Sequence, residues 1–275
     1  MRKIFLLSAL LLSLSAAAQE KIEMLFSSPE AKDVHIDMSD LTRDPGITEY
    51  SPANPNGIAV IMCPGGGYSH QAFRHEGHDM AQWFNAQGVT YVVLKYRIPE
   101  GDFRRPLSDA EQAVRTVRSH AEEWGIDPSR IGIMGASAGG HLASMLSTHY
   151  SDSASRPDFQ VLLYPVVTMD RSYTHKGSRD NLLGKNASEE QEKRFSNELQ
   201  VTPSTPQAFI VLSSDDRTVP PANSVNYYSS LIANGVPATM HIYPVGGHGW
   251  GFRDSFKYKR QWTGELEKWL REQLK

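Results

Sequence analysis

The sequence predicts an α/β fold in which a mostly parallel β-sheet carries helices on both faces. Several continuous apolar runs are short and bounded by turn residues, which is typical of strands covered on both faces. Helical segments separate these runs, and alternation of strands with helices favours a parallel sheet. With 275 residues, 40% of them hydrophobic, the chain suits one such domain. A net charge of −3 without a basic stripe argues against nucleic-acid binding.

The first residues have the parts of a secretory signal peptide. A basic start at residues 1–3 precedes an apolar run over residues 4–14, and an A-x-A pattern ends at Ala18. The apolar run is too short to span a bilayer, so we expect no stable membrane insertion. Cleavage after about Ala18 would leave residues 19–275 as a single domain in the periplasm or outside the cell.

The strands are predicted from apolar runs that end at glycine, proline or polar residues. The first two are expected at an edge of the sheet, and the later runs in its buried centre. One central run ends at Cys63, the only cysteine, so an intramolecular disulfide is impossible and we expect a buried, inert thiol. The expected strands are residues 33–39, 47–51, 57–63, 89–97, 130–134, 159–164, 207–213 and 238–243.

The clearest helix is expected to begin at Ser108. This residue is a candidate N-cap, and Glu111 three residues later would complete a capping box. Ala110, Val114 and the apolar residues that follow recur at helical spacing until Gly125 ends the pattern. The other helices are expected at residues 76–87, 140–150, 221–234 and 255–274.

The pentapeptide G-A-S-A-G at residues 135–139 is the G-x-S-x-G pattern of a sharp strand–turn–helix corner. Gly135 and Gly139 allow neighbouring backbone to come close, and the turn holds Ser137 in a strained, exposed pose. A strand is expected before this corner and a helix after it. We therefore predict that Ser137 is a nucleophile.

Two further loops carry the partners that such a serine needs. The loop after residues 207–213 contains Asp216, and the loop after residues 238–243 contains His248. Loops at the carboxyl ends of parallel strands converge, and the chain order Ser–Asp–His suits this type of sheet. His248 is the predicted base and Asp216 the group that orients it. Asp215 remains an alternative partner for the histidine.

Negative charge that develops on a reacting oxygen needs fixed donors. The backbone N–H groups of Gly66 and Gly67, in a triple glycine after a buried strand, and of Ala138 are the candidates. Tyr68 and Trp250 flank the motifs and are candidates for binding substrate. An equal alternative is that both pack in the interior.

Residues 166–205 form a long segment without a strong strand pattern, with a polar helical patch at residues 188–197. Connections of this length are functional or disordered. We predict a small insertion over the site.

A metal site is a weak alternative for the cluster His75, Glu76, His78 and Asp79. The order H-E-G-H lacks the H-E-x-x-H spacing that places two imidazoles on one face of a helix. We expect capping or loop hydrogen bonds from these residues, with no metal and no cofactor.

With these motifs in hand, the chain resembles the α/β-hydrolase superfamily, and within it the small esterases related to hormone-sensitive lipase. It is most similar to bacterial carbohydrate esterases described as acetyl xylan esterases or feruloyl-esterase-like proteins. Pro64 departs from the histidine that many lipase relatives carry before the glycines, which loosens that link. The resemblance runs from about Gly57 to the C-terminus and rests on PGGGY at 64–68, HEG at 75–77, LKYR at 94–97, GASAGGHLAS at 135–144, DDRTVP at 215–220 and GGHGWGF at 246–252.

The resemblance implies a serine carboxylesterase that removes acetyl or other small acyl groups from carbohydrate such as xylan, through an acyl-enzyme. An acylated carbohydrate is then the expected partner, and the oligomeric state stays open. A feruloyl or aryl esterase is one alternative. A serine peptidase of the prolyl-oligopeptidase type is another, weakened because the chain has no room for a large gating domain. A binding protein without activity is disfavoured because all three triad candidates are present.

Overall fold

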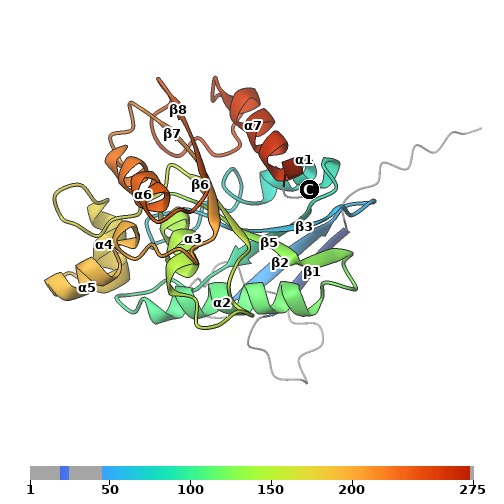
Figure 1. The fold of residues 1–275 in the computed structure, drawn as a ribbon, viewed down its shortest axis with the longest axis horizontal. Helices are drawn as coiled ribbons and strands as arrows, with labels where there is room; N and C mark the ends of the chain where they lie inside the picture. Colours follow the sequence, from blue (N-terminus) through green and yellow to red (C-terminus); the bar gives the residue numbers. More distant parts are fainter. Residues whose placement is uncertain (1–18, 25–44, 273–275) are drawn as a thin grey trace, which may run out of the picture.

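The computed structural model describes residues 19–24 and 45–272, which form one eight-stranded sheet with helices on both sides (Figure 1). The strand order is β1-β2-β4-β3-β5-β6-β7-β8. The β1–β2 and β2–β4 pairs are antiparallel, and the other neighbours are parallel. The strands are β1 (Gln19–Met24), β2 (Gly46–Ser51), β3 (Gly57–Cys63), β4 (Thr90–Lys95), β5 (Ile126–Ala136), β6 (Phe159–Leu163), β7 (Gln207–Ser213) and β8 (Ala238–Tyr243).

The predicted mostly parallel sheet is confirmed, and most of its strands fall where the apolar runs place them. The expected signal peptide at 1–18 and the expected strand at 33–39 lie outside the described residues. Strand β1 was not foreseen, and it pairs with β2 at the edge of the sheet.

The helices divide between the two faces of the sheet. Figure 1 shows α2 (Arg104–Ser119), α3 (Ala138–His149) and α6 (Ala222–Ala233) on one face, and α1 (Ala81–Ala86) and α7 (Lys259–Glu272) on the other. Within the described ranges, no helix is both long and apolar enough to cross a membrane.

The core lies in the central strands, whose side chains are buried on both faces of the sheet as the continuous apolar runs predict. Cys63 is a free, fully buried cysteine at the end of β3. Burial raises the pKa of its thiol, because an apolar surrounding disfavours the thiolate. The expectation of a buried, unreactive thiol agrees with this position.

The helix predicted for residues 76–87 begins later than expected. Residues 78–80 form a single 3-10 turn, and α1 starts only at Ala81. Before it, the backbone N–H of Glu76 donates to the carbonyl of Ala72, and that of His78 donates to Phe73. These tight turns pass through Gly77, where a Cβ would overlap the carbonyl of Phe73. Gly77 itself has φ −155° and ψ −106°, outside the helical region, so a regular helix does not run through it.

The predicted capping box at Ser108 is wrong, because α2 begins four residues earlier, at Arg104. Asp102 accepts a hydrogen bond from the backbone N–H of Arg104 at 3.1 Å. The first backbone donor of α2 is therefore bonded by an aspartate outside the expected segment. Pro106 is tolerated in the first turn, where a missing N–H costs nothing. Ser108 lies inside the helix, and its hydroxyl donates to the carbonyl of Arg105.

The segment 166–205 is an insertion with its own short helices, α4 (Lys176–Leu183) and α5 (Glu189–Arg194) and the 3-10 turn η2 (Asn197–Leu199). The predicted helical patch corresponds to α5 and η2. Ser188 caps α5 in a capping box with Gln191.

Candidate active site

Ser137 sits at the corner between β5 and α3, with a positive φ of 53° and ψ of −120°. Two glycines make this corner possible. A Cβ on Gly135 would overlap the carbonyl of Gly139, and a Cβ on Gly139 would overlap the carbonyl of Cys63. The backbone thus crosses at distances that only glycine allows, and the strained serine is held by packing on both sides.

Replacing Gly139 with alanine is expected to lower the free energy of unfolding by about 3 kcal/mol, because the new methyl group must displace the backbone of β3. Urea unfolding followed by circular dichroism measures this change. Gly264 in α7 is the matched control, since a Cβ there meets nothing within 4 Å. Its replacement with alanine should stabilise the protein slightly. Equal effects at both sites would contradict this explanation of the corner.

Loops after β5, β7 and β8 bring the three predicted side chains together. His248 Nε2 lies 2.7 Å from Ser137 Oγ, and His248 Nδ1 lies 2.6 Å from Asp216 Oδ2. The other carboxylate oxygen of Asp216 accepts hydrogen bonds from the backbone N–H groups of Thr218 and Val219, both at 2.9 Å. An imidazole placed between a hydroxyl and a fixed carboxylate can take the hydroxyl proton when the oxygen attacks an electrophile.

The neighbouring carboxylate, Asp215, does not reach the histidine ring. It is exposed, and its Oδ1 accepts a hydrogen bond from the backbone N–H of Gly247 at 2.8 Å. This hydrogen bond holds the pKa of Asp215 below its usual value. Asp215 thus fastens the loop that carries His248, whereas Asp216 contacts the ring itself.

The candidate oxyanion donors flank Ser137. Gly66 and Gly67 line the same cavity as the serine, with positive φ angles of 133° and 64°, and Ala138 is the first residue of α3. Their backbone N–H groups donate to no acceptor in the part of the chain that the structure describes. Backbone donors without other partners, beside the nucleophile, are what stabilises a tetrahedral oxyanion.

Tyr68 and Trp250 both pack in the interior, as the packing alternative expects, and neither lines the cavity that contains Ser137. Tyr68 is 0% exposed, and its hydroxyl lies 3.0 Å from Nδ1 of His141. Trp250 is 4% exposed, stacks on Phe256, and donates its indole N–H to Ser213 Oγ. Each follows a glycine-rich motif in sequence, but its side chain turns into the core.

His141, the partner of Tyr68, is a fully buried and neutral imidazole. The carbonyl of Phe195 lies 2.9 Å from Nε2 and can only accept, so Nε2 carries the proton and Nδ1 accepts from the Tyr68 hydroxyl. Burial lowers the pKa of His141 from 6.5 to about 4.

This histidine is expected to make the protein acid-sensitive. Its pKa is lower in the folded than in the unfolded state, so the unfolded state binds more protons as the pH falls from 6.5 towards 4. Stability should decline over that window by up to about 3 kcal/mol. Urea unfolding between pH 7 and 4 measures the slope. The His141→Gln variant should show a smaller slope, and identical slopes would contradict the assignment.

Glu76 and Tyr164 join the loops around Ser137 to one another. Both are buried; Glu76 Oε2 accepts from the backbone N–H of Gly65 at 3.0 Å, and Oε1 accepts from the Tyr164 hydroxyl at 2.7 Å. That hydroxyl accepts from the N–H of Gly251 at 2.8 Å, and its ring packs edge-on against His248. Burial raises the pKa of Tyr164, so its proton stays in place.

Glu76 thus makes the loop hydrogen bonds expected from its motif. In the described segments, no group of three or more His, Cys, Asp or Glu side chains is placed to hold a metal ion. Sequence reasoning missed Tyr164. Its place directly after β6, at the same edge of the sheet as Ser137, is the signal that would have found it.

A cavity of about 500 Å³ opens over the serine. The segment 166–205 forms one wall of this cavity through His175, Gly177 and Asn181. The amide of Asn181 donates to the carbonyl of Gly67 at 2.8 Å, which ties α4 to the glycine loop. The lining residues are Gly66, Gly67, Ser69, His70, Ala72, His75, Glu76, Ser137, His175, Gly177, Asn181, Thr218, His248, Gly249 and Arg253.

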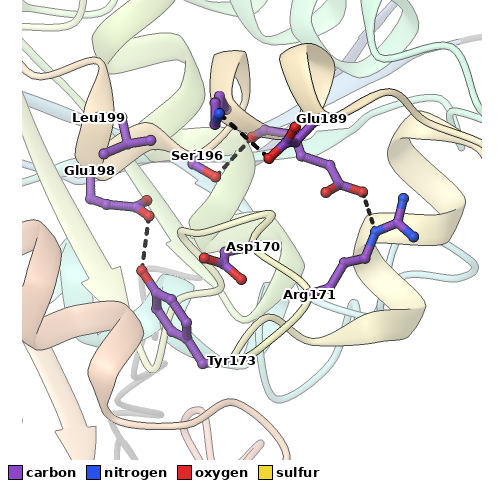
Figure 2. A pocket seen from close by; sticks show the side chains of 9 residues that line it. Asp170, Arg171, Tyr173, Glu189, Ser196, Glu198 and Leu199 are labelled. Atoms are coloured by element: carbon purple, nitrogen blue, oxygen red, sulfur yellow. Dashed lines mark hydrogen bonds and ion pairs between the residues drawn. The ribbon is translucent and has the colours of Figure 1, made fainter.

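A second pocket, of about 480 Å³, lies in the insertion and shares no residue with this cavity. Figure 2 shows Tyr173 reaching towards Glu198, and its hydroxyl donates to that carboxylate at 3.1 Å. Arg171 pairs with Glu192 at 2.7 Å. The hydrogen bond and the ion pair join η2 and α5 to the segment of chain that leads into α4.

The fold and the Ser137–His248–Asp216 arrangement define a class of proteins. These are the hydrolases whose nucleophilic serine lies on a sharp strand-to-helix turn at the edge of a mostly parallel sheet. Comparison with known proteins agrees with that class. The chain belongs to the α/β hydrolase fold family, whose model matches residues 60–252.

Several relatives are similar over long stretches. An acetylxylan esterase of Xylanibacter ruminicola is 39% identical over 98% of this chain and 55% of its own length. An endo-1,4-beta-xylanase B of Butyrivibrio fibrisolvens is 36% identical over 69% of this chain and 32% of its own length. The chain thus spans about half or less of these relatives.

Among solved structures, an acetyl ester-xyloside bifunctional hydrolase from Caldicellulosiruptor lactoaceticus superposes with a TM-score of 0.82 at 34% identity. The match covers 92% of this chain and 96% of that one. The likeness therefore extends over nearly the whole of both chains.

Proposed function

We propose that this protein is a serine carboxylesterase that removes acetyl groups from acetylated carbohydrate of the xylan type. The contact between Ser137, His248 and Asp216 supports the reaction type. The names of the relatives, an acetylxylan esterase and an acetyl ester-xyloside hydrolase, support the substrate class.

The first half of the proposed reaction transfers the acetyl group to the enzyme. Ser137 Oγ attacks the ester carbonyl carbon while its proton passes to His248 Nε2, and Asp216 stabilises the charged ring. The N–H groups of Gly66, Gly67 and Ala138 hold the oxyanion. Loss of one such donor typically costs about 100- to 1,000-fold in rate. When the carbon–oxygen bond to the sugar breaks, His248 returns the proton to the leaving alcohol.

The second half returns the enzyme to its starting state. A water oxygen attacks the acetyl carbon and gives its proton to His248 Nε2. The bond between the acetyl carbon and Ser137 Oγ then breaks, the proton returns to Oγ, and acetate leaves. No cofactor is needed in either half.

The residues that line the cavity also support a carbohydrate ester as the substrate. Ligand sites of about 300–1,000 Å³ are usually lined mainly by apolar side chains. Here Ala72 is the only aliphatic side chain among the described lining residues, and the only rings are imidazoles. Such a wall suits a hydroxylated sugar with a short acyl group. It offers few apolar side chains to a long acyl chain or a feruloyl ring.

Acetate release from acetylated xylan by the purified protein tests the proposal. The same preparation is given a feruloylated oligosaccharide and a proline-terminated peptide. We expect acetate from the xylan and little turnover of the other two. Cleavage of the feruloyl ester or the peptide without acetate release would keep the serine mechanism and reject the proposed substrate.

Export of the protein is also a proposal, supported by the pattern of residues 1–18. After expression with periplasmic extraction, N-terminal sequencing should begin at Gln19. A cytoplasmic product that retains Met1 would reject export.

A further inference from the structure

His175 brings a third imidazole to the cavity, from the insertion rather than from the sheet. It precedes α4 as its N-cap, is half-buried, and lines the cavity with Ser137 and His248. Its Cε1 lies 3.6 Å from the position that a Cβ on Gly67 would take. The ring therefore stands beside the glycine loop that holds the oxyanion candidates.

The hydrogen bonds of His175 fix the position of its proton. The backbone N–H of Ser178 donates to Nδ1 at 3.2 Å, and the Ser178 hydroxyl lies 2.8 Å from the same nitrogen. An Nδ1 that accepts leaves the proton on Nε2. Burial and, after it, the nearby His248 lower the pKa of His175, so the ring is neutral near pH 7. Across the described residues, no protein acceptor bonds to Nε2.

We propose that His175 binds the substrate: its Nε2–H donates a hydrogen bond to an oxygen of the sugar that carries the acetyl group. This inference rests on the proposed function. His248 returns its proton to the leaving alcohol, so side chains near His248 face the sugar half of the ester. A neutral donor suits the uncharged oxygens of a sugar, and one N–H of the neighbouring Asn181 amide already donates to the carbonyl of Gly67. His175 therefore favours carbohydrate esters over simple ones.

Two variants of His175 separate this role from capping. His175→Asn keeps a short side-chain acceptor for the N–H of Ser178, as an N-cap requires, but cannot reach as far as Nε2. His175→Gln places an amide N–H near the position of Nε2 but is a poor cap. Kinetics on an acetylated xylo-oligosaccharide and on p-nitrophenyl acetate, which carries no sugar, are compared for both variants.

We expect His175→Asn to lower kcat/KM on the oligosaccharide about five- to tenfold, mainly through KM, and to leave p-nitrophenyl acetate within twofold. His175→Gln should retain most of the preference for the oligosaccharide while its melting temperature falls. Ser178→Ala, which removes only the hydroxyl at Nδ1, should leave the ratio of the two substrates unchanged.

Equal losses on both substrates, or no loss on either, in His175→Asn would overturn the inference. The parent enzyme in the same assay distinguishes this failure from failure of the proposed function. If the parent hydrolyses p-nitrophenyl acetate but releases no acetate from the oligosaccharide, the carbohydrate substrate itself is rejected and the inference falls with it. If the parent releases acetate from the oligosaccharide and His175→Asn changes the rates on the two substrates equally, only the role of His175 is wrong.

Discussion

The Ser137→Ala variant is expected to lose activity on acetylated xylan by on the order of 10⁴- to 10⁶-fold in kcat, because no acyl-enzyme can form without Oγ. The substitution removes one oxygen and keeps the Cβ, so the backbone at φ 53° meets the same strain as in the parent. The fold should therefore persist. Acetate release gives the rate, and thermal unfolding verifies that the variant is native.

Covalent labelling supplies an independent measure of the same serine. An organophosphonate that mimics the tetrahedral intermediate should modify Ser137 in the parent and leave the variant unlabelled, as detected by mass spectrometry. A variant that is folded and retains more than a tenth of the parent's rate would mean that another group is the nucleophile.

The strands could be predicted from sequence because their signal is local. The run 207–213 and the run 238–243 coincide with β7 and β8, since each is bounded by polar or turn residues on both sides. The start of α2 could not be found in the same way. The first backbone N–H of this helix is bonded by Asp102, which lies outside the apolar pattern. The first turn also contains Pro106, a residue usually taken as a helix breaker.

The three residues of the candidate triad could be placed because chain order and strand ends constrain them. Asp216 is the predicted partner of the histidine and lies against its ring, but the sequence leaves Asp215 open as the alternative, because the choice depends on the backbone of a single loop. Asp216 turns inward because the N–H groups of Thr218 and Val219 bind its second oxygen, while Asp215 turns to Gly247. The local sequence is compatible with either aspartate facing the histidine.

The residues wrongly placed or missed share one cause, which is distance along the chain. Tyr68 is a candidate for binding substrate because it follows the glycines, with packing as the equal alternative, and its hydroxyl meets His141, which is 73 positions away. Tyr164 and Glu76, which are 88 positions apart in the sequence, form a hydrogen bond. No window of sequence contains both partners of such a contact.

Glu76 and Tyr164 also explain why the site needs a buried carboxylate that does no chemistry. One end of this pair holds Gly65, before the oxyanion candidates, and the other holds Gly251, after His248. The two loops that must stay in register during the reaction are thus fixed to the same carboxylate, one directly and the other through the Tyr164 hydroxyl. Preorganisation of this kind lets donors and base meet the transition state without rearrangement.

The two adjacent aspartates allow a matched test of the orienting carboxylate. Asp216→Asn is expected to lower kcat about 10⁴-fold, because an amide donates to Nδ1 of His248 and leaves the proton on Nε2. Nε2, 2.7 Å from Ser137 Oγ, then cannot accept the serine proton. Asp215→Asn keeps a carbonyl oxygen for the N–H of Gly247 and should stay within a fewfold of the parent.

The assay is again acetate release, with kcat followed from pH 6 to 9 for both variants. Because the amide fixes the wrong tautomer, raising the pH should not restore Asp216→Asn in the way that it restores an enzyme whose base is merely protonated. A large loss in Asp215→Asn with a small loss in Asp216→Asn would mean that the two carboxylates exchange places in solution. Comparable losses in both would mean that the loop, rather than one carboxylate, orients the histidine.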